Sequence, residues 1–441
     1  MLLHRKPGPI YMEEDYTLEP MTQVELNDIA KKHAMFMVGK PGGRRAVVKD
    51  RNLDGLSFEG YNLGQSDFTG CIMSNAHMEN VNFESATLFG CDFENSNLKN
   101  AKMVRADMRG ADIESADLTG ADMTGADLRE GATLIKRKKK SSSNAFSENT
   151  AGNVDFNGST MNETNLTQAS AQGADFSNTE MKNTNLQGAD LQNTDFSNAD
   201  ISNSDMTGAD LRGSNLDNAI MTNTKIENTE KSGAKMDNIL TEGTVGEDFT
   251  EVALSLDEYI RHHVSWVGSA GREGKQLDLT GKDMRKLKSL ANKRLTAMKA
   301  IGTTFAEMDL IGIELQSCDL EASDFRKCDM RGSDLRGSNL KGANLSRANL
   351  RSANMRALMF DKADGTKIVK PCDFEGANLS HANLAGAQLH NANLRGANLS
   401  HADLSDTDLR RADLRGANLK DANMNSALIA GTIFDPKEET G

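Results

Sequence analysis

The sequence predicts a repeat solenoid in which each coil takes up twenty residues. Phe156, Phe176 and Phe196 lie twenty residues apart, and an aspartate precedes each of them. Between them an apolar residue stands at every fifth position, as in ADLQN, TDFSN and ADISN. This period fits neither a helix, which repeats about every 3.6 residues, nor a strand, which repeats about every two. It requires a backbone that turns once per five residues and closes a coil after four turns.

Residues twenty positions apart should therefore lie above one another in a stack of coils. The three phenylalanines form one predicted column. Two further predicted columns consist of Met161, Met181, Ile201 and Met221, and of Leu166, Leu186, Met206 and Ile226. Stacking is expected because a single coil cannot bury its apolar residues, whereas neighbouring coils bury them against each other.

The repeated motif Ala-(Asp/Asn)-Leu-x-x, as in ADLQN and ADLRG, resembles the pentapeptide-repeat family over most of the chain. The resemblance implies an all-β solenoid, a right-handed quadrilateral β-helix with four short faces per coil. It implies that the central Leu, Phe or Met and the small residue two positions earlier point inward, while the other three positions face water. Some family members look similar in a further respect: a helix bearing His and Trp and then a Gly-rich turn precede their repeats.

The cysteines test this register independently. Each lies two residues before a central apolar residue, in the inward small-residue position: Cys71, Cys91, Cys318, Cys328 and Cys372. Free cysteine packs in such a position as a small hydrophobic residue. The chain shows no signal-peptide pattern and no apolar run of about 20 residues, so we expect a cytoplasmic protein without a transmembrane segment. In that compartment a disulfide between Cys71 and Cys91 is not expected.

We expect two modules, each preceded by a helical cap. The predicted parts are a tail at 1–23, cap 1 at 24–52, module 1 at 53–246 with a basic loop at 135–150, a linker and cap 2 at 247–302, module 2 at 303–434 with a loop at 361–372, and a tail at 435–441. The register in module 1 runs to Leu128, slips by one residue to Leu134 and resumes at Phe156. In module 2 it runs from Leu310 to Phe360 and from Phe374 to Phe434.

The caps are predicted from helical apolar spacing after Val24 and from a capping-box pattern at Thr22 and Glu25. Residues 26–36 can be overlaid on 256–266, which indicates that the cap is duplicated. A solenoid needs such caps because its ends expose strand edges and apolar side chains. Residues 285–302 suit either irregular first coils, which we favour, or a basic amphipathic helix.

The overlay places His33 on His263, and a histidine at the same position of a duplicated element raises the question of a catalytic or metal site. Neither histidine has a second ligand or a nucleophile at a motif spacing. We therefore expect both to pack the cap helix on the first coil. No metal-ligand cluster is expected elsewhere in the chain.

Charge is uneven along module 1. Residues 53–134 contain fourteen acidic and five basic residues, and residues 150–246 contain the same numbers. Stacking at about 4.8 Å per coil would place Asp155, Asp175 and Asp195 in one column of like charge. Either hydrogen bonds at the turns or a basic partner must offset their repulsion.

Two groups of cations are further candidate partner-binding sites. The first is the basic loop, with Lys136, Arg137, Lys138, Lys139 and Lys140. Because five consecutive cations cannot be buried unpaired, this segment is either a solvated loop or a docking arm for an acidic protein, nucleic acid or phosphate. The second lies in module 2, where Arg331 should stack on Arg351 and Arg336 on Arg356. These arginines either pair with nearby aspartates or form a face for an acidic partner, such as module 1 of another copy.

The sequence favours a non-enzymatic scaffold that presents rigid faces and two loops to protein partners. Motifs for nucleophilic hydrolases, P-loops, dinucleotide binding and zinc proteases are absent from credible contexts, so we expect no catalytic residues and no cofactor. Direct nucleic-acid binding is not expected, and the oligomeric state is left open. The alternative follows from the resemblance, because quinolone-resistance members of the family look like duplex DNA and bind DNA gyrase. Acidic module 1 fits that alternative.

Overall fold

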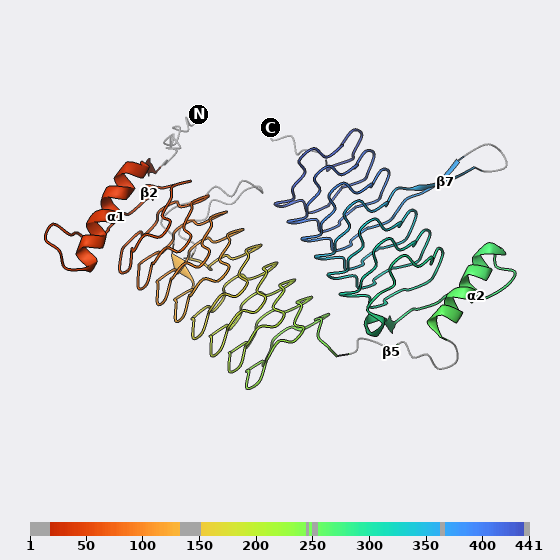
Figure 1. Ribbon diagram of the computed structural model, residues 1–441, viewed down its shortest axis with the longest axis horizontal. Helices are drawn as coiled ribbons and strands as arrows, with labels where there is room; N and C mark the ends of the chain where they lie inside the picture. The colour runs from red at the N-terminus through yellow and green to blue at the C-terminus, as the bar shows by residue number, and fades with distance from the viewer. Residues whose placement is uncertain (1–17, 133–150, 244–246, 249–254, 362–366, 436–441) are drawn as a thin grey trace, which may run out of the picture. The chain divides into compact units, whose positions relative to one another are not determined.

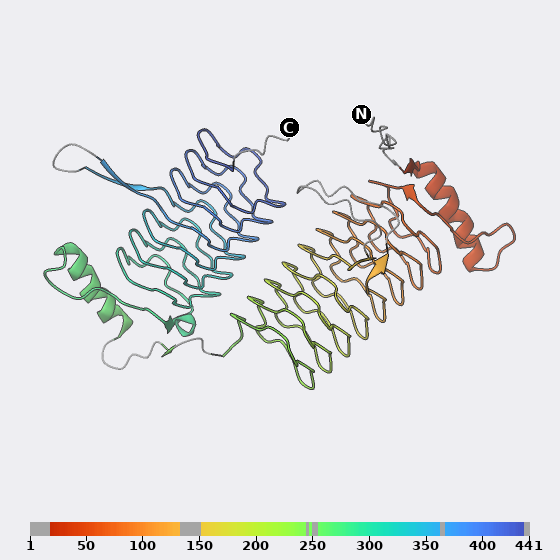
Figure 2. The ribbon, with the colours of Figure 1, turned by 180° about the vertical axis from the view of Figure 1, so that it is seen from behind.

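The structure, a computed structural model, describes residues 18–132, 151–243, 247–248, 255–361 and 367–435. The chain divides into unit 1, Met1–Glu242, and unit 2, Gly243–Gly441. Each unit is a stack of coils that begins beside an α-helix (Figure 1). Figure 2 shows the same two stacks from behind.

Successive coils are joined by parallel β-bridges. In unit 1 the bridges connect residues twenty apart in four columns, as in the set Asp155–Asp175, Thr160–Glu180, Asn165–Asn185 and Ser170–Asp190. Backbone hydrogen bonds follow the same step, since the N–H of Phe156 donates to the carbonyl of Asp175 at 2.8 Å. Each unit is therefore a β-helix solenoid. The five-residue period predicted the stack of coils, and the family resemblance implied the β-helix.

The predicted phenylalanine column is confirmed. The rings of Phe156 and Phe176 stack with centroids 4.7 Å apart, and those of Phe176 and Phe196 with centroids 5.0 Å apart. All three side chains are fully buried. The second and third predicted columns are confirmed as well, because the residues that precede their members are bridged coil to coil.

The chain turns at the residue two positions after each centre. Asn183 and Gly188, for example, have φ angles of 58° and 64°. Glycine enters this left-handed region without steric cost and asparagine does so more readily than most residues, which explains their recurrence in the repeat. A short backbone hydrogen bond closes the corner, as between the N–H of Ala189 and the carbonyl of Leu186 at 3.1 Å.

All five cysteines point into the coils, as predicted. They are free and fully buried. Their thiols donate to backbone carbonyls, as Cys91 does to Phe68 at 3.0 Å. Burial raises the pKa of Cys71 to about 12. These thiols therefore belong to the apolar interior of the stack.

Unit 1 begins with a strand, a helix and a second strand. The strands β1, Glu19–Pro20, and β2, Arg51–Asn52, pair in parallel, and the helix α1, Gln23–Met37, lies between them in the sequence. The predicted capping box is present, with Thr22 as the N-cap and Glu25 as its reciprocal partner. Part of the predicted tail is thus a strand that continues the first coil, and the sequence carried no period to reveal it.

Unit 2 begins in the same order. Strand β5, Glu247–Asp248, pairs in parallel with β6, Lys282–Asp283, and the helix α2, Leu256–Gly268, separates them. Ser255 and Glu258 form a second capping box. The two caps therefore share one design, in which a short strand extends the first coil and a helix covers it.

Residues 285–302 form coils, as favoured from the sequence. After a single turn of 3₁₀ helix, η1, Arg285–Leu287, the chain enters bridges such as Ser289–Asp309 and Arg294–Glu314. The bridge from Asp278 to Lys299 shows that the second stack begins well before residue 303. The predicted start of module 2 was too late because its first coils lack the Ala-Asp-Leu motif.

At each insertion the chain leaves the wall of the stack along one strand and returns along a second strand that is paired with the first. In unit 1, β3, Gly131–Ala132, pairs antiparallel with β4, Ala151–Gly152. The slip to Leu134 and the whole basic loop at 135–150 lie outside the described residues. Asp112 is bridged to Asp155, so the stack continues across this insertion.

The insertion in unit 2 corrects the prediction of a loop at 361–372. It is a hairpin of two antiparallel strands, β7, Leu358–Asp361, and β8, Lys367–Lys370. Phe360 therefore belongs to β7 and is not the centre of a coil, although it keeps the five-residue step. Cys372 is already inside the next coil. The sequence pattern misled here because an apolar strand followed Met355 at the right spacing.

Candidate functional site

His33 and His263 join each cap to its first coil. His33 lies within α1, accepts at Nδ1 from the backbone N–H of Ala46 at 2.9 Å, and its Nε2 lies 2.9 Å from the carbonyl of Gly64. His263 in α2 makes the same pair of contacts with Leu277 and Thr296, each at 3.0 Å. An Nδ1 that accepts leaves the proton on Nε2, which donates to the carbonyl.

Both imidazoles are fully buried. Burial lowers the pKa of His33 and of His263, although the hydrogen bonds to backbone carbonyls oppose this effect. The predicted packing role is confirmed. Because both ring nitrogens of each histidine are engaged by backbone groups, neither ring offers a nitrogen to a metal or substrate.

The predicted aspartate column is longer than expected. Bridges connect Asp92, Asp112, Asp155, Asp175 and Asp195 on successive coils. Each of the three predicted members accepts a backbone hydrogen bond within its own turn: Asn157 donates to Asp155 at 2.9 Å, and Ser177 and Ser197 donate to Asp175 and Asp195 at 2.8 Å. Hydrogen bonds at the turns therefore offset part of the repulsion, which was one of the two expected explanations.

In this column, the carboxyl group of Asp155 has a raised pKa. Burial raises its pKa to about 6, and the neighbouring Asp175, Asp112 and Glu114 add to the increase, while the hydrogen bond from Asn157 opposes it. Several carboxylates that face a Lys, Arg or Thr on these walls shift the other way, as Asp117, Asp127 and Asp205 do. Hydrogen bonds from Thr207 lower the pKa of Asp205 to about 2, for example, although burial opposes them.

Three carboxylates on this wall are close enough to hold a cation. Asp112, Glu114 and Asp155 have ligand atoms within 4.8 Å of one another, and this is the one such group among the described residues. Three acidic side chains in proximity do not by themselves define a metal site, since repeat stacking alone places them there. We assign no metal to them.

The four predicted arginines fall into two chemical classes. Arg331 and Arg336 each form a two-pronged ion pair with the aspartate two residues earlier, Asp329 or Asp334, with closest distances of 2.7 Å. Arg351 and Arg356 follow Asn349 and Asn354 instead, and Arg356 donates from Nε to the side-chain oxygen of Asn354 at 3.2 Å. The predicted stacking is supported by bridges from Asp329 to Asn349 and from Asp334 to Asn354.

The second class lies in a run of repeats that contains no carboxylate. Residues 336–360 contain no Asp or Glu and carry Arg336, Lys341, Arg347, Arg351 and Arg356. Arg351 and Arg356, which follow asparagines in their own repeats, are both exposed. Their positive charge is therefore not neutralised within their own repeats, unlike that of Arg331 and Arg336.

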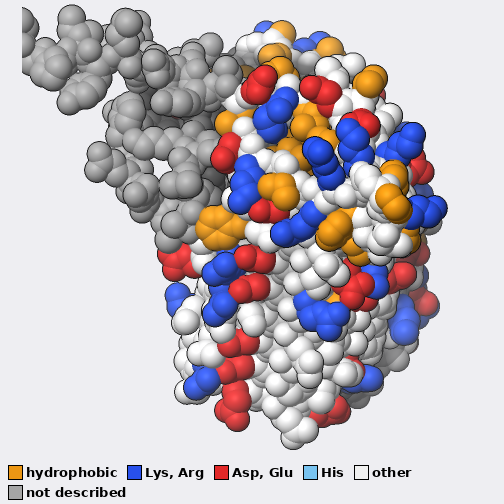
Figure 3. All heavy atoms as spheres, turned by 90° about the vertical axis from the view of Figure 1, so that its left-hand side faces the viewer, with side chains coloured by type: hydrophobic (Ala, Val, Ile, Leu, Met, Phe, Trp, Pro, Cys, Tyr) orange, Lys and Arg blue, Asp and Glu red, His pale blue; other side chains and the backbone are white. Residues whose placement is uncertain are grey.

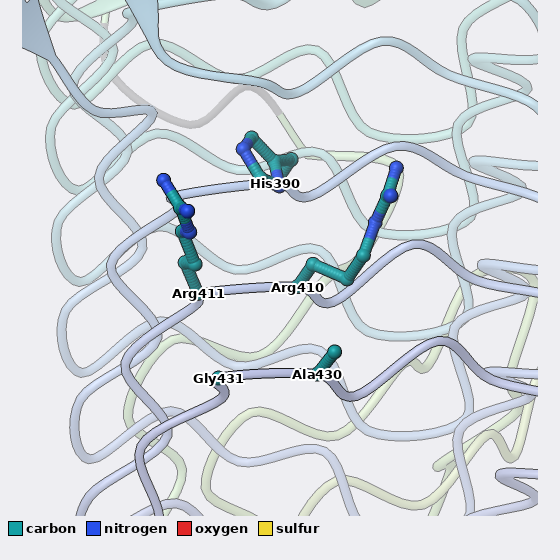
Figure 4. Close-up of a pocket in the computed structure, with 5 residues that line it drawn as sticks. All are labelled: His390, Arg410, Arg411, Ala430 and Gly431. Atoms are coloured by element: carbon teal, nitrogen blue, oxygen red, sulfur yellow. The ribbon is translucent and has the colours of Figure 1, made fainter.

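A shallow basic hollow lies on the same wall as Arg336 and Arg356. It has a volume of about 500 Å³ and is lined by His390, Arg410, Arg411, Ala430 and Gly431. Figure 4 shows His390 on one coil, with the two arginine side chains of the next coil extending to either side of it. Arg410 pairs with Asp408 at 2.8 Å. The Nδ1 atom of His390 is buried and has no hydrogen-bond partner among the described residues.

The repeat pattern of the family described as Pentapeptide repeats matches this chain in eight copies. The matched residues are 52–90, 91–129, 152–188, 184–223, 301–337, 328–364, 372–411 and 397–435. Together they cover more than half of the sequence. The chain belongs to the pentapeptide-repeat family.

The chain is also similar to several solved structures. QnrB1, a plasmid-mediated fluoroquinolone resistance protein, is 19% identical in a trypsin-treated form, with a TM-score of 0.32 over 44% of this chain and 90% of that chain. HetL from the cyanobacterium Nostoc, involved in heterocyst differentiation regulation, is 18% identical, with a TM-score of 0.14 over 93% and 97%. Rfr23 from the cyanobacterium Cyanothece is 23% identical, with a TM-score of 0.19 over 31% and 91%. No curated protein matches this chain in sequence.

Among the residues that the structure describes, large apolar side chains are exposed at four places on this pentapeptide-repeat protein, one of which is the cap helix of unit 2 with Val264 and Val267. On the cap of unit 1 they include Val24, Val38 and Val47, and Figure 3 shows apolar side chains among Lys and Arg over the upper part of that end. The last coil of unit 2 exposes Leu428, Ile429, Ile433 and Phe434, and the hairpin exposes Met359, Ile368 and Val369. The exposed hairpin residues and the hollow were missed from the sequence. The acid-free run at 336–360 was a readable signal for the basic residues beside the hairpin, but not for the hollow.

Two further expectations concern the basic loop and the absence of a transmembrane segment. Lys136, Arg137, Lys138, Lys139 and Lys140 lie outside the described residues. Among the residues that the structure does describe, no helix combines the length and the apolar character needed to cross a bilayer.

Proposed function

We propose that this pentapeptide-repeat protein is a non-enzymatic cytoplasmic scaffold, with right-handed four-sided β-helices whose outer walls bind other proteins. The observation that carries the proposal is the division between interior and wall. Central residues such as Phe176 and Leu186 are fully buried, so coil interiors are filled by side chains. The polar chemistry therefore lies on the walls, where partners have access to it.

Two groups of outward-facing residues favour protein partners of opposite charge. The column Asp155, Asp175 and Asp195 offers carboxylates at one-coil intervals to a basic partner. Arg331, Arg336, Arg351 and Arg356, with the predicted basic loop, offer cations to an acidic partner. Arg351 and Arg356 are the stronger candidates, because the residues two positions earlier in their own repeats are neutral.

The experiment is affinity capture with three forms of the full chain. One form replaces Lys136, Arg137, Lys138, Lys139 and Lys140 by serine, a second combines Asp155→Asn, Asp175→Asn and Asp195→Asn, and the third is unchanged. Loss of a reproducible protein partner from one variant only would assign that partner to the altered surface. Identical capture by all three forms would contradict both surface assignments.

A second candidate function is modulation of DNA gyrase by imitation of DNA. It is favoured by the acidity of module 1, where residues 53–134 and 150–246 each contain fourteen acidic and five basic residues. A rigid wall of regularly spaced carboxylates can attract a protein surface that is built for phosphates. The scaffold proposal predicts that the purified protein leaves gyrase supercoiling unchanged. Inhibition, or protection from a quinolone, would favour the alternative.

A further inference from the structure

The β7–β8 hairpin projects from the wall of unit 2 with apolar side chains on both of its faces. Met359 pairs with Val369 across the hairpin, and Phe360 pairs with Ile368 one position along. Neighbouring pairs point to opposite faces of a strand pair. The exposed fractions are 54% for Met359, 45% for Ile368 and 47% for Val369, so neither face is covered within the described residues.

An isolated two-stranded hairpin is marginally stable in water. Its base packs on the coil wall, where Leu358 contacts Gly337: a Cβ on that glycine would lie 2.9 Å from the Leu358 side chain. Further along, every residue of β8 is exposed. The hairpin therefore presents apolar groups that its own wall does not bury.

The hairpin rises beside a basic part of unit 2 that contains no Asp or Glu, residues 336–360. Arg356 lies two residues before β7, and Lys370 ends β8. The chain leaves its coil for the hairpin at Ala357. The backbone N–H of Ala357 donates to the carbonyl of His390, on the next coil, at 3.2 Å. One coil further on is Arg411, which lines the hollow in Figure 4 together with His390 and Arg410. Apolar strands and a basic wall thus adjoin.

We propose that the β7–β8 hairpin and this basic wall dock on an anionic lipid bilayer. Met359, Ile368 and Val369 enter the interface between headgroups and acyl chains. Arg356 and the hollow formed by His390, Arg410 and Arg411 contact lipid phosphates. This goes beyond the proposed scaffold function, because its partner is a lipid surface and not a protein.

Geometry and charge favour a bilayer over a protein partner. A protein that covered both faces of the hairpin would need a slot with two apolar walls, whereas a bilayer interface surrounds an inserted ribbon on all sides. The cations beside the hairpin complement the negative surface of a cytoplasmic leaflet. Peripheral binding generally needs both signals, because a small apolar insertion alone gives only weak and reversible attachment.

The test is co-sedimentation of the full chain with vesicles of phosphatidylcholine alone and of phosphatidylcholine with phosphatidylglycerol. We expect binding to the anionic vesicles, weakened by salt. The double variant Met359→Asp and Val369→Asp should reduce binding at least tenfold, since a carboxylate resists insertion. Arg356→Glu and Arg411→Glu should each reduce it by about fivefold or more, the value for loss of one cation near such a surface.

Matched controls lie on unit 1. Val24→Asp changes a valine that is 78% exposed on α1, and Arg44→Glu changes an exposed arginine after the same helix. Both should bind as the unchanged chain does. A variant with serine at 136–140 distinguishes binding through the hairpin from binding through the basic loop, because that loop is a second source of attraction to anionic vesicles.

Three results would overturn the proposal: no binding to anionic vesicles, unchanged binding of the hairpin variant, or loss of binding in the 136–140 variant alone. Hairpin-dependent capture of an acidic protein, without vesicle binding, would assign the surface to that protein instead. If the double variant unfolds, Val369→Trp keeps the proposal testable. Its fluorescence should shift to the blue with anionic vesicles, beyond any shift from Trp266, and an unchanged spectrum would contradict insertion.

Discussion

At the residue scale, His33 and His263 stabilise their caps as neutral hydrogen-bonding groups. In each cap one imidazole satisfies a backbone N–H and a carbonyl that would otherwise be buried without partners. We predict that His33→Phe lowers the free energy of unfolding by about 2 to 4 kcal/mol, because it leaves both groups unsatisfied. Urea unfolding at pH 8 measures the loss. His33→Gln, which can keep one hydrogen bond, should cost less, and equal losses would contradict this role.

The same histidines predict a dependence of stability on pH. Their folded-state pKa values are lowered, so the unfolded chain takes up protons first as the pH falls. The contribution of each histidine is fully present above its unfolded pKa of about 6.5 and is lost as the pH falls through that value toward the folded pKa. Unfolding between pH 8 and 5 should show this loss, and it should be smaller in His33→Gln.

Asp155 predicts a dependence of stability on pH of the opposite sign. Its pKa is raised from 3.8 to about 6, so the folded state binds this proton more tightly than the unfolded state does. Ionised Asp155 therefore destabilises the fold above pH 6, and the penalty is relieved as the pH falls toward 4. We expect Asp155→Asn to raise the free energy of unfolding at pH 8 by about 1 to 3 kcal/mol and to gain little at pH 4. Asparagine keeps the turn, since Asn215 occupies the same column.

Asp117 is the matched control for that prediction. Burial acts to raise its pKa, but hydrogen bonds from Thr119 and Lys99 outweigh burial and lower it. Its ionised form therefore stabilises the fold at neutral pH. Asp117→Asn should be destabilising at pH 8, and a stabilising effect there would show that the charge of the wall as a whole, and not the surroundings of each carboxylate, sets the outcome.

At the element scale, sequence reasoning succeeded where one coil repeats the next and failed where the chain leaves that rule. The columns of Phe156 and its neighbours could be predicted because burial imposes the same residue type every twenty positions. Strands β1 and β5 could not, because two residues that pair through their backbones leave no side-chain period. The hairpin was misassigned because Phe360 kept the five-residue step by chance.

The candidate surfaces were predictable to a similar degree. The aspartate column and the stacked arginines follow from the repeat, since a wall position recurs with each coil. That Arg331 follows an aspartate in its own repeat, whereas Arg351 follows an asparagine, could also be read from Asp329 and Asn349. The hollow at His390 could not, because its shape depends on the small residues Ala430 and Gly431 on the adjoining coil.

At the scale of the whole molecule, the chain contains two separate apolar cores. One extends from Met21 to Met221 and the other from Leu277 to Leu414. Each also has its own strand–helix–strand cap. Stability in a solenoid is a sum of coil and interface contributions between neighbours, so a defect in one stack should act mainly on the core that contains it.

We therefore predict that Phe176→Ala destabilises unit 1 and leaves unit 2 unchanged. Phe176 is fully buried and stacks on a phenylalanine at each side, so truncation should cost about 3 to 5 kcal/mol. Phe325→Ala is the matched variant of unit 2, where Phe325 stacks on Phe305. Calorimetry should resolve two transitions, each variant lowering a different one. A single transition that both variants lower equally would mean that the two cores unfold as one cooperative structure, and the duplicated caps would then not mark independent units.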